Sequence, residues 1–500
     1  MVRFKFLKIY IALSLMIITI CLMNKALAKI KQFFGYQDLT RDTRPIVTMI
    51  LFAIPLVITA FANNGMSLLN SIVLKHTVGG DSVTAINQTS SLSSLILQFG
   101  FGCTSGFGIV IANLHGAKNY EGVKKAIVSS MLACVVIWLV LGAIGIASLR
   151  SLLNALHVNE LYYEKAYLYF AVVLSCYIFN LLSNLSGHIL RALGNSFVVL
   201  FTTIFTLSCQ VGVCFLLTSK SIGNLDTVGA GLAIMVASLL NVIISFAIIF
   251  KKYKPNKESF KFDKTIYKDL FRLGVPIGFQ WSILFIGSFV VASQVNLYGV
   301  YASKGMAVYT SWEGIAVNSV MGALGTMMVN FVGQNYGAKK YDRVKRGIRD
   351  GYIIVLCVYA LILAITLPTT KLVPYIYLPY DEVNERVSFY ATTYLYITLT
   401  ASLFQGILTV SRGALQGIKK PLFPFISGIG ELIARISVSL LIPYLVDQNY
   451  KVTLSDQSYI GLSFSNASAW LVSMLVMGGA VFFMILNNKS FGKETDIIKE

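Results

Sequence analysis

The chain contains the stretch Gly116-Ala-Lys-Asn-Tyr-Glu-Gly-Val-Lys-Lys125, and a closely matching stretch, Gly337-Ala-Lys-Lys-Tyr-Asp-Arg-Val-Lys-Arg346, follows 221 residues later. A second match has the same offset, because Pro55 in Ala-Ile-Pro-Leu corresponds to Pro276 in Gly-Val-Pro-Ile. Two separated matches at one offset indicate an internal repeat. The sequence therefore predicts two halves with the same internal organisation.

The residues around these stretches are strongly apolar. Of the 500 residues, 56% are hydrophobic and 13% are charged, and the mean hydropathy is +0.71. Soluble domains carry about 25% charged residues, and disordered chains have low hydrophobicity, so both classes are excluded. The apolar runs are about 20 residues or longer, which is the length that a helix needs to cross a bilayer. A transmembrane barrel would instead alternate apolar and polar residues.

Twelve apolar segments are long enough to be membrane helices. They cover residues 47–73, 84–112, 126–148, 162–188, 196–218, 228–250, 271–297, 305–332, 350–368, 387–411, 421–445 and 460–487. Each repeat contains six of them, an even number, so the halves have the same orientation and are related by a pseudo-two-fold axis along the membrane normal. This organisation is typical of secondary transporters, in which two bundles rock to open a cleft to either side.

The predicted fold class is an all-α integral membrane protein with twelve transmembrane helices in two parallel six-helix repeats, plus a short N-terminal hydrophobic segment. The predicted regions are an N-terminal segment with a basic stretch (1–44), a six-helix bundle (45–250), a basic linker (251–270), a second six-helix bundle (271–488) and a tail (489–500).

The short N-terminal segment Ile9–Met23 has three interpretations. Its 15 residues would span only about 22 Å as a helix, which is short of the hydrocarbon core. It could lie in the interface or form a thirteenth span. Ala26-Leu-Ala28 also resembles a signal-peptidase site. Cleavage after export would, however, place the stretch Lys29–Arg44 outside, against the charge pattern of every later loop.

The distribution of basic residues predicts the orientation. The chain has 41 basic and 22 acidic residues, a net charge of +19. With residues 24–46 inside, the inner stretches hold 29 Lys or Arg and the outer loops hold seven. This bias predicts that both ends of the twelve-helix core are cytoplasmic, and it accounts for the charge without a nucleic-acid partner. The richest stretch, Lys251–Arg272, is interpreted as a solvated connector between the halves.

The sequence carries no catalytic or cofactor motif. A nucleophile elbow, a Walker A loop, an HExxH helix and paired metal-ligand spacings are absent from the sequence, and the seven cysteines all lie in apolar stretches. We therefore predict neither an enzyme nor a bound cofactor or metal. Transport energy would have to come from a proton or sodium gradient, or from a partner.

Ionisable residues at membrane depth are costly, so each is a candidate functional residue. The second half has three of them: Glu313, Glu431 and Arg435. Glu431 and Arg435 are spaced i, i+4, which allows a buried ion pair with a structural, gating or coupling role. Glu313 has no basic residue near it in sequence. Burial favours the protonated form of an isolated carboxyl group, so Glu313 is predicted either to couple transport to an ion or to cap a polar network.

Polar residues also form faces on several predicted helices. Such faces must look away from lipid, so they line either a wet cavity or a helix–helix contact. The candidate cavity-lining residues are Asn63, Asn64, Asn70, Asn180, Asn184 and Gln280.

The chain resembles the multidrug and toxic compound extrusion (MATE) transporters over about residues 45–487. The most specific match is Val332-Gly-Gln-Asn-Tyr-Gly-Ala-Lys-Lys-Tyr-Asp-Arg343. Weaker matches occur in the expected order at Arg191-Ala-Leu-Gly194, Arg272-Leu-Gly-Val-Pro276, Gly413-Ala-Leu-Gln-Gly417 and Glu431-Leu-Ile-Ala-Arg435. The resemblance implies a V-shaped twelve-helix fold and export of organic cations in exchange for protons or sodium ions.

This chain departs from the family pattern in its first half. Family members often have an Asp near the outer end of the first helix, where this chain has Asn70-Ser71. An acid of the fifth helix falls near Gln210 and Cys214, so it is also missing. Glu313 matches a helix-8 Glu found in part of the family. The resemblance is therefore compatible with a proton site in the C-terminal bundle.

The predicted function is secondary active export of amphipathic, cationic small molecules such as drugs or toxins across the cell membrane, by a monomer embedded in the lipid bilayer. Two alternatives remain open. One is a flippase for a lipid-linked precursor from the same superfamily, which a groove rich in Arg or Lys would favour. The other is a membrane scaffold or sensor that transports nothing.

Overall fold

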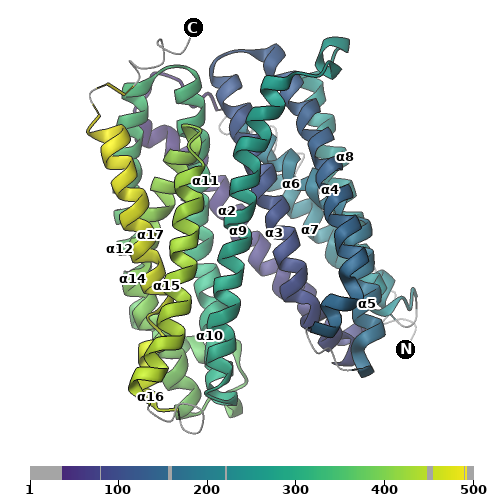
Figure 1. Cartoon of the computed structure of the whole chain (residues 1–500). Coiled ribbons are helices and arrows are strands. Elements are labelled where there is room, and N and C mark those ends of the chain that lie inside the picture. Colours follow the sequence, from purple (N-terminus) through teal and green to yellow (C-terminus); the bar gives the residue numbers. More distant parts are fainter. Residues whose placement is uncertain are drawn as a thin grey trace. The chain divides into compact units, whose positions relative to one another are not determined.

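The structure is a computed structural model that describes residues 37–78, 80–155, 160–219, 222–447, 454–488 and 490–491. All regular secondary structure in these residues is helical. The N-terminal hydrophobic segment Ile9–Met23 and most of the predicted tail lie outside the described residues. The predicted all-helical fold class is confirmed (Figure 1).

The chain forms two compact units. Unit 1 contains Ile54–Ile111 and Tyr120–Tyr267, and unit 2 contains Leu39–Ala53, Ala112–Asn119 and Lys268–Glu500. The first turns of α2 (Pro45–Thr77) and the last turn of α3 (Gly80–Gly116) therefore pack with the second half of the sequence.

The described part of the first half of the chain is helical almost throughout. Its helices are α2 (Pro45–Thr77), α3 (Gly80–Gly116), α4 (Tyr120–Ala155), α5 (Glu160–Ser175), α6 (Tyr177–Ala192), α7 (Ser196–Thr218) and α8 (Asp226–Lys252), followed by the short 3₁₀ turn η1 (Lys257–Phe260).

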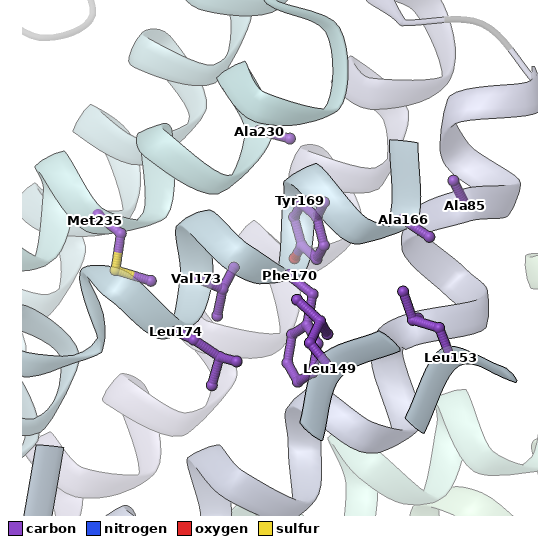
Figure 2. Close-up of a cluster of buried hydrophobic side chains, with 10 residues drawn as sticks. All are labelled: Ala85, Leu149, Leu153, Ala166, Tyr169, Phe170, Val173, Leu174, Ala230 and Met235. Atoms are coloured by element: carbon purple, nitrogen blue, oxygen red, sulfur yellow. The ribbon is translucent and has the colours of Figure 1, made fainter. Parts of the chain in front are cut away.

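A buried apolar cluster holds α5 in unit 1. Figure 2 shows the inner face of α5 in contact with side chains from α3, α4 and α8. Burying such side chains contributes about 1.5–3 kcal/mol each in water, and less where lipid is the alternative environment. The cluster consists of Ala85, Leu149, Leu153, Ala166, Tyr169, Phe170, Val173, Leu174, Ala230 and Met235.

Unit 2 is built around α14 (Glu385–Gly417), which packs against α10, α11, α12 and α17. The other elements of the second half are α9 (Lys264–Asn296), α10 (Val300–Glu313), η2 (Gly314–Asn318), α11 (Ser319–Gly337), α12 (Tyr341–Thr369), η3 (Thr370–Leu372), α13 (Val373–Tyr377), η4 (Tyr380–Glu382), α15 (Leu422–Val446), α16 (Asp456–Leu462), α17 (Ser465–Val481) and η5 (Phe482–Leu486).

The number of membrane spans agrees with the sequence. Among the described residues, 11 helices are long and apolar enough to cross a membrane, and α5 with α6 makes a twelfth if the bent pair is one span. The pair was predicted as one segment, 162–188. The structure breaks it at Cys176 with a bend of 50°. Several helices also extend beyond their apolar runs. For example, α12 begins at Tyr341 and continues through the basic residues before the apolar run at 350.

The internal repeat is visible in the backbone of the two quoted stretches. Lys118 and Lys339 both adopt the left-handed conformation, each with φ 57°. The turns around them have the same pattern of backbone hydrogen bonds. Asn119 N donates to Leu114 O over 3.0 Å, and Lys340 N donates to Asn335 O over 2.9 Å. This pattern is a helix C-cap of the Schellman type. The repeated sequence therefore ends two helices in the same way.

The repeated glycines explain why these stretches match. Within unit 2, the end of α3 packs directly on α11. A Cβ on Gly116 would overlap the backbone of Gln334, and a Cβ on Gly337 would overlap the backbone of Asn113. These two contacts are reciprocal, since both partners differ by the repeat offset of 221. Only glycine allows the two helix backbones to approach this closely.

Candidate functional site

Three charged side chains form a buried cluster in unit 2. Arg412 from α14 places Nη2 2.6 Å from Oε1 of Glu431 on α15, and Nη2 of Arg435 lies 3.8 Å from Oε2 of the same carboxylate. The side chains are 14%, 3% and 8% exposed, respectively. Two guanidinium groups therefore share one carboxylate away from water. Such an arrangement reduces the cost of burying each charge.

The cluster continues through hydrogen bonds toward α10. Arg435 Nε donates to Asn466 Oδ1 over 3.2 Å, and Asn466 Nδ2 donates to the hydroxyl of Tyr309 over 2.9 Å. Tyr309 lies one turn before Glu313 on α10, and its hydroxyl interacts with the Glu313 carboxyl group. One polar network thus joins Glu313 to the Glu431–Arg435 pair. The sequence had indicated these as two separate features.

Glu313 lies at an irregular point of its helix. It is the last residue of α10, and the next five residues, Gly314–Asn318, form a single π-helical turn before α11 continues the span. Directly after this turn, the hydroxyl of Ser319 donates back to the carbonyl oxygen of Gly314 over 2.8 Å. Such π-turns within α-helices are frequent at functional sites. Glu313 is only 6% exposed.

Sequence reasoning missed three members of this network. Arg412 falls just outside the predicted helix 387–411, but in the structure it lies inside α14, which ends at Gly417. In the sequence, Gly417 followed by Lys419-Lys420-Pro421 is a helix-end pattern that could have extended the predicted helix past Arg412. Asn466 and Tyr309 are common residue types in helices. Only their partners distinguish them, and those partners come from other helices.

A separate polar pocket lies in unit 1, between α2 and α7. Its volume is about 110 Å³. None of its lining side chains titrates near neutral pH, so it presents hydrogen-bonding groups without charge. The lining residues are Asn63, Met66, Ser67, Asn70, Leu207, Gln210 and Val211.

The pocket contains two of the three asparagines that were proposed for α2. The Oδ1 atom of Asn70 is buried and has no hydrogen-bond partner. Asn64 lies outside the pocket lining and donates to the carbonyl oxygen of Ala60 in its own helix over 3.2 Å. Gln210, which lies near the place where the family pattern has an acid in the fifth helix, also lines the pocket.

The remaining polar candidates lie elsewhere. Asn184 Nδ2 donates to Asn180 Oδ1 over 2.9 Å on α6, and both side chains are half-buried. Gln280 on α9 is fully buried and accepts a hydrogen bond from Gln416 over 3.3 Å, so it lies in a contact between helices of unit 2. It is not among the residues that line the pocket in unit 1.

The residues of the most specific sequence motif hold the backbone that precedes α2. Gln334 Oε1 accepts from Leu39 N over 3.2 Å, and Asn335 Nδ2 donates to Leu39 O over 3.0 Å. Lys340 donates to the carbonyl oxygen of Thr40 over 2.8 Å. The guanidinium group of Arg343 lies over a phenylalanine ring, 5.4 Å from its centroid. The motif therefore fixes the entry of the chain into unit 2 and does not line the pocket.

Within the part of the chain that the structure describes, no group of His, Cys, Asp and Glu side chains could hold a metal ion. The six described cysteines are free.

The eleven or twelve apolar spans among the described residues, together with the internal six-helix repeat, define a multi-pass membrane protein with the organisation of a transporter. The model of the MatE family matches residues 55–216 and 276–441, which is more than half of the chain. The chain therefore belongs to the multidrug and toxic compound extrusion (MATE) family, whose members are efflux transporters and not enzymes.

Similar proteins agree with this assignment. The chain is 23% identical over 460 residues to the "Probable multidrug resistance protein YoeA" of Bacillus subtilis, covering 89% of this chain and 95% of that protein. It is 23% identical over 379 residues to the "Multidrug export protein MepA" of Staphylococcus haemolyticus, covering 74% and 80% of the two chains.

Solved structures share the fold. A multidrug resistance MATE family transporter in an outward-facing conformation superposes with a TM-score of 0.78 at 17% identity, over 91% of this chain and 99% of that chain. A MOP superfamily transporter from Pyrococcus furiosus superposes with a TM-score of 0.78 at 17% identity, over 90% and 98%. The predicted MATE-like twelve-helix architecture is confirmed by these matches.

Proposed function

We propose that this efflux transporter exports amphipathic organic cations in exchange for protons, and that Glu313 carries the proton. The observation that supports this choice is the contrast between two buried carboxylates. Glu431 has a guanidinium group at each oxygen, whereas Glu313 has no cation within 4 Å among the described residues. Burial favours the neutral form of a carboxyl group most strongly where no cation is paired with it.

The charge of the network gives Glu313 a way to couple proton and solute. With Glu313 ionised, the network holds two carboxylates and two guanidinium groups, so it is neutral. Protonation of Glu313 leaves one uncompensated positive charge in a medium of low dielectric constant, where charges interact strongly. A cationic solute is then repelled. Proton uptake would therefore promote release of the solute, and proton loss would promote binding of the next one.

Tyr309 and Asn466 connect the two ends of this mechanism. Because the Tyr309 hydroxyl interacts with Glu313 and accepts from Asn466, protonation of Glu313 makes its carboxyl group a weaker acceptor for that hydroxyl. The change is passed to Arg435 through Asn466. The π-helical turn next to Glu313 provides backbone that can adjust in response.

The neutral pocket of unit 1 would bind the polar, uncharged parts of the solute. Its amide and hydroxyl groups offer both donors and acceptors, and Asn70 Oδ1 has an acceptor position that is unused. The pocket offers no carboxylate for a proton or a sodium ion, so the proposed coupling is assigned to unit 2.

The arrangement of charges gives little support to the alternative of a flippase for anionic lipid-linked precursors. Arg412 and Arg435 are buried and both contact Glu431, and ionised Glu313 balances the second guanidinium charge, so the network in this state offers no net positive charge to an anionic substrate. The polar network and the pocket also favour transport over a scaffold that moves nothing. We propose in addition that both ends of the twelve-helix core face the cytoplasm, and that the transporter works in the cell membrane as a monomer.

The direct test is efflux of ethidium, a fluorescent organic cation, from proteoliposomes that contain the purified protein. We expect an imposed proton gradient to drive ethidium against its concentration gradient, and an equal sodium gradient at constant pH to leave it unchanged. Sodium-driven accumulation without a response to pH would contradict the proposed coupling ion. The absence of any transport of cations, with transport of a lipid analogue instead, would favour the flippase.

A further inference from the structure

We propose that the connector between α8 and α9 is a binding surface for the headgroups of anionic phospholipids in the cytoplasmic leaflet. This linker surface consists of Lys251, Lys254, Lys257, Phe260, Phe262 and Lys264. The proposal uses the predicted orientation of the chain but does not depend on which solute or ion is transported.

The inner side of the connector is fixed against the rest of unit 1. Asn256 caps the turn η1 by accepting from Ser259 N over 2.9 Å, and its Nδ2 donates to Glu121 Oε2 at the start of α4 over 3.1 Å. Ser259 is 1% exposed. The segment therefore has a defined inner face that packs on the protein, and its other side chains point away from it.

The acidic residues of the connector are already engaged by neighbouring groups. Glu258 pairs with Lys261 over 2.6 Å. Asp263 caps α9 by accepting from Thr265 N and Ile266 N over 3.1 and 3.3 Å. What the connector presents outward is consequently dominated by lysines.

Four lysines carry the uncompensated charge. Each of them is exposed and has no carboxylate within 4 Å among the described residues; they are Lys251, Lys254, Lys257 and Lys264. The first of them follows directly on the apolar run of α8 that ends at Phe250, which places it where the chain leaves the hydrocarbon. A cluster of four to eight basic residues immediately cytoplasmic of a membrane helix is typical of sites for anionic lipids.

Two phenylalanines on the same segment point to a lipid surface in preference to a soluble acidic partner. Phe260 is 67% exposed and Phe262 is 75% exposed. The ring of Phe262 stacks on Tyr267 at a centroid distance of 4.9 Å and an interplanar angle of 19°, which holds it in its outward position. Exposed aromatic rings between lysines are the pattern of segments that bind at the headgroup boundary, where the rings are removed from water and the ammonium groups meet phosphate.

The test uses full-length Phe262→Trp protein reconstituted in bilayers that contain lipids brominated on the acyl chains, which quench indole fluorescence at short range. The signal of the new indole is obtained by subtracting the quenching of the parent protein. We expect brominated phosphatidylglycerol to quench it at least twofold more than brominated phosphatidylcholine at the same mole fraction. Salt should remove this difference, because headgroup attraction is screened within about 10 Å at 0.1 M.

Matched variants distinguish lipid binding from general proximity to the bilayer. Adding Lys254→Gln, Lys257→Gln and Lys264→Gln should abolish the preference, since each lysine near the surface contributes about fivefold to binding. Tyr380→Trp, at an 84% exposed aromatic position in the loop before α14, should show no preference. Equal quenching by both lipids, or a preference that survives the lysine substitutions, would overturn the proposal. Absence of quenching would do so as well, and would point to a soluble partner.

Discussion

Removing Glu431 should affect its two arginine partners unequally, because the carboxylate lies closer to Arg412 than to Arg435. The perturbation is a set of neutral substitutions, Glu431→Gln, Arg412→Gln and Arg435→Gln, made singly and in the two pairs that contain Glu431. Each single variant leaves at least one buried charge with less compensation. We expect each pair to lose less stability than the sum of its two single variants.

The distances set the expected order of the couplings. At separations of 2.6 and 3.8 Å and an effective dielectric constant of about 20, the attractions are about 6 and about 4 kcal/mol. Measured couplings will be smaller, because interactions between polar groups in a membrane protein are typically about 0.6 kcal/mol and reach about 1.7 kcal/mol. We therefore predict that the coupling of Glu431 with Arg412 exceeds its coupling with Arg435 by about 1 kcal/mol.

The assay is equilibrium unfolding of the purified variants in mixed micelles, with double-mutant cycles for both pairs. The cycles remove the contributions that Arg435 makes through its hydrogen bonds to Asn466 and to the carbonyl oxygen of Leu284. Additive effects in both cycles would refute the existence of the cluster. A larger coupling with Arg435 would refute the geometry that places Arg412 as the principal partner.

Two further predictions concern packing and the pocket. Gly337→Ala should lower the free energy of unfolding by about 1–3 kcal/mol, because the new Cβ overlaps the backbone of α3. Gly322→Ala, on the same helix but with open space around it, should be neutral or stabilising. Thermal unfolding compares the two variants, and equal effects would contradict the close helix contact. Asn70→Leu should weaken solute binding about tenfold, because it removes an acceptor from the pocket, whereas Asn64→Leu, outside the lining, should leave binding unchanged. Binding titrations in detergent measure both variants. Equal weakening would show that the pocket is not the binding site.

The fold could be predicted from the sequence because lipid imposes simple rules on a chain. Apolar runs of sufficient length must be helices, and an offset shared by two motifs reveals the repeat. The bend at Cys176 could not be predicted in this way. The residues at the break, Ser175-Cys-Tyr177, include no Pro or Gly to mark it, and the helices on both sides pack against α4 and α8.

The candidate site could be predicted only in part. Glu313, Glu431 and Arg435 stand out because charge at membrane depth is rare. Their connection through Asn466 and Tyr309 depends on contacts between helices that are distant in sequence, and no local pattern encodes it. The separation of Asn64 from the pocket follows from its direction on α2, which differs from that of its neighbour Asn63 although the residue type is the same.

The role of Glu313 as the proton carrier is tested most directly by measuring proton release when ethidium binds to the purified protein in weakly buffered detergent solution. The parent protein should release protons on binding, because the bound cation favours ionised Glu313. The Glu313→Gln variant should bind ethidium without releasing protons, and in proteoliposomes it should lose export driven by a pH gradient while keeping exchange between labelled and unlabelled ethidium. Proton release and gradient-driven export that persist in this variant would contradict the proposal and remove Glu313 from the coupling mechanism.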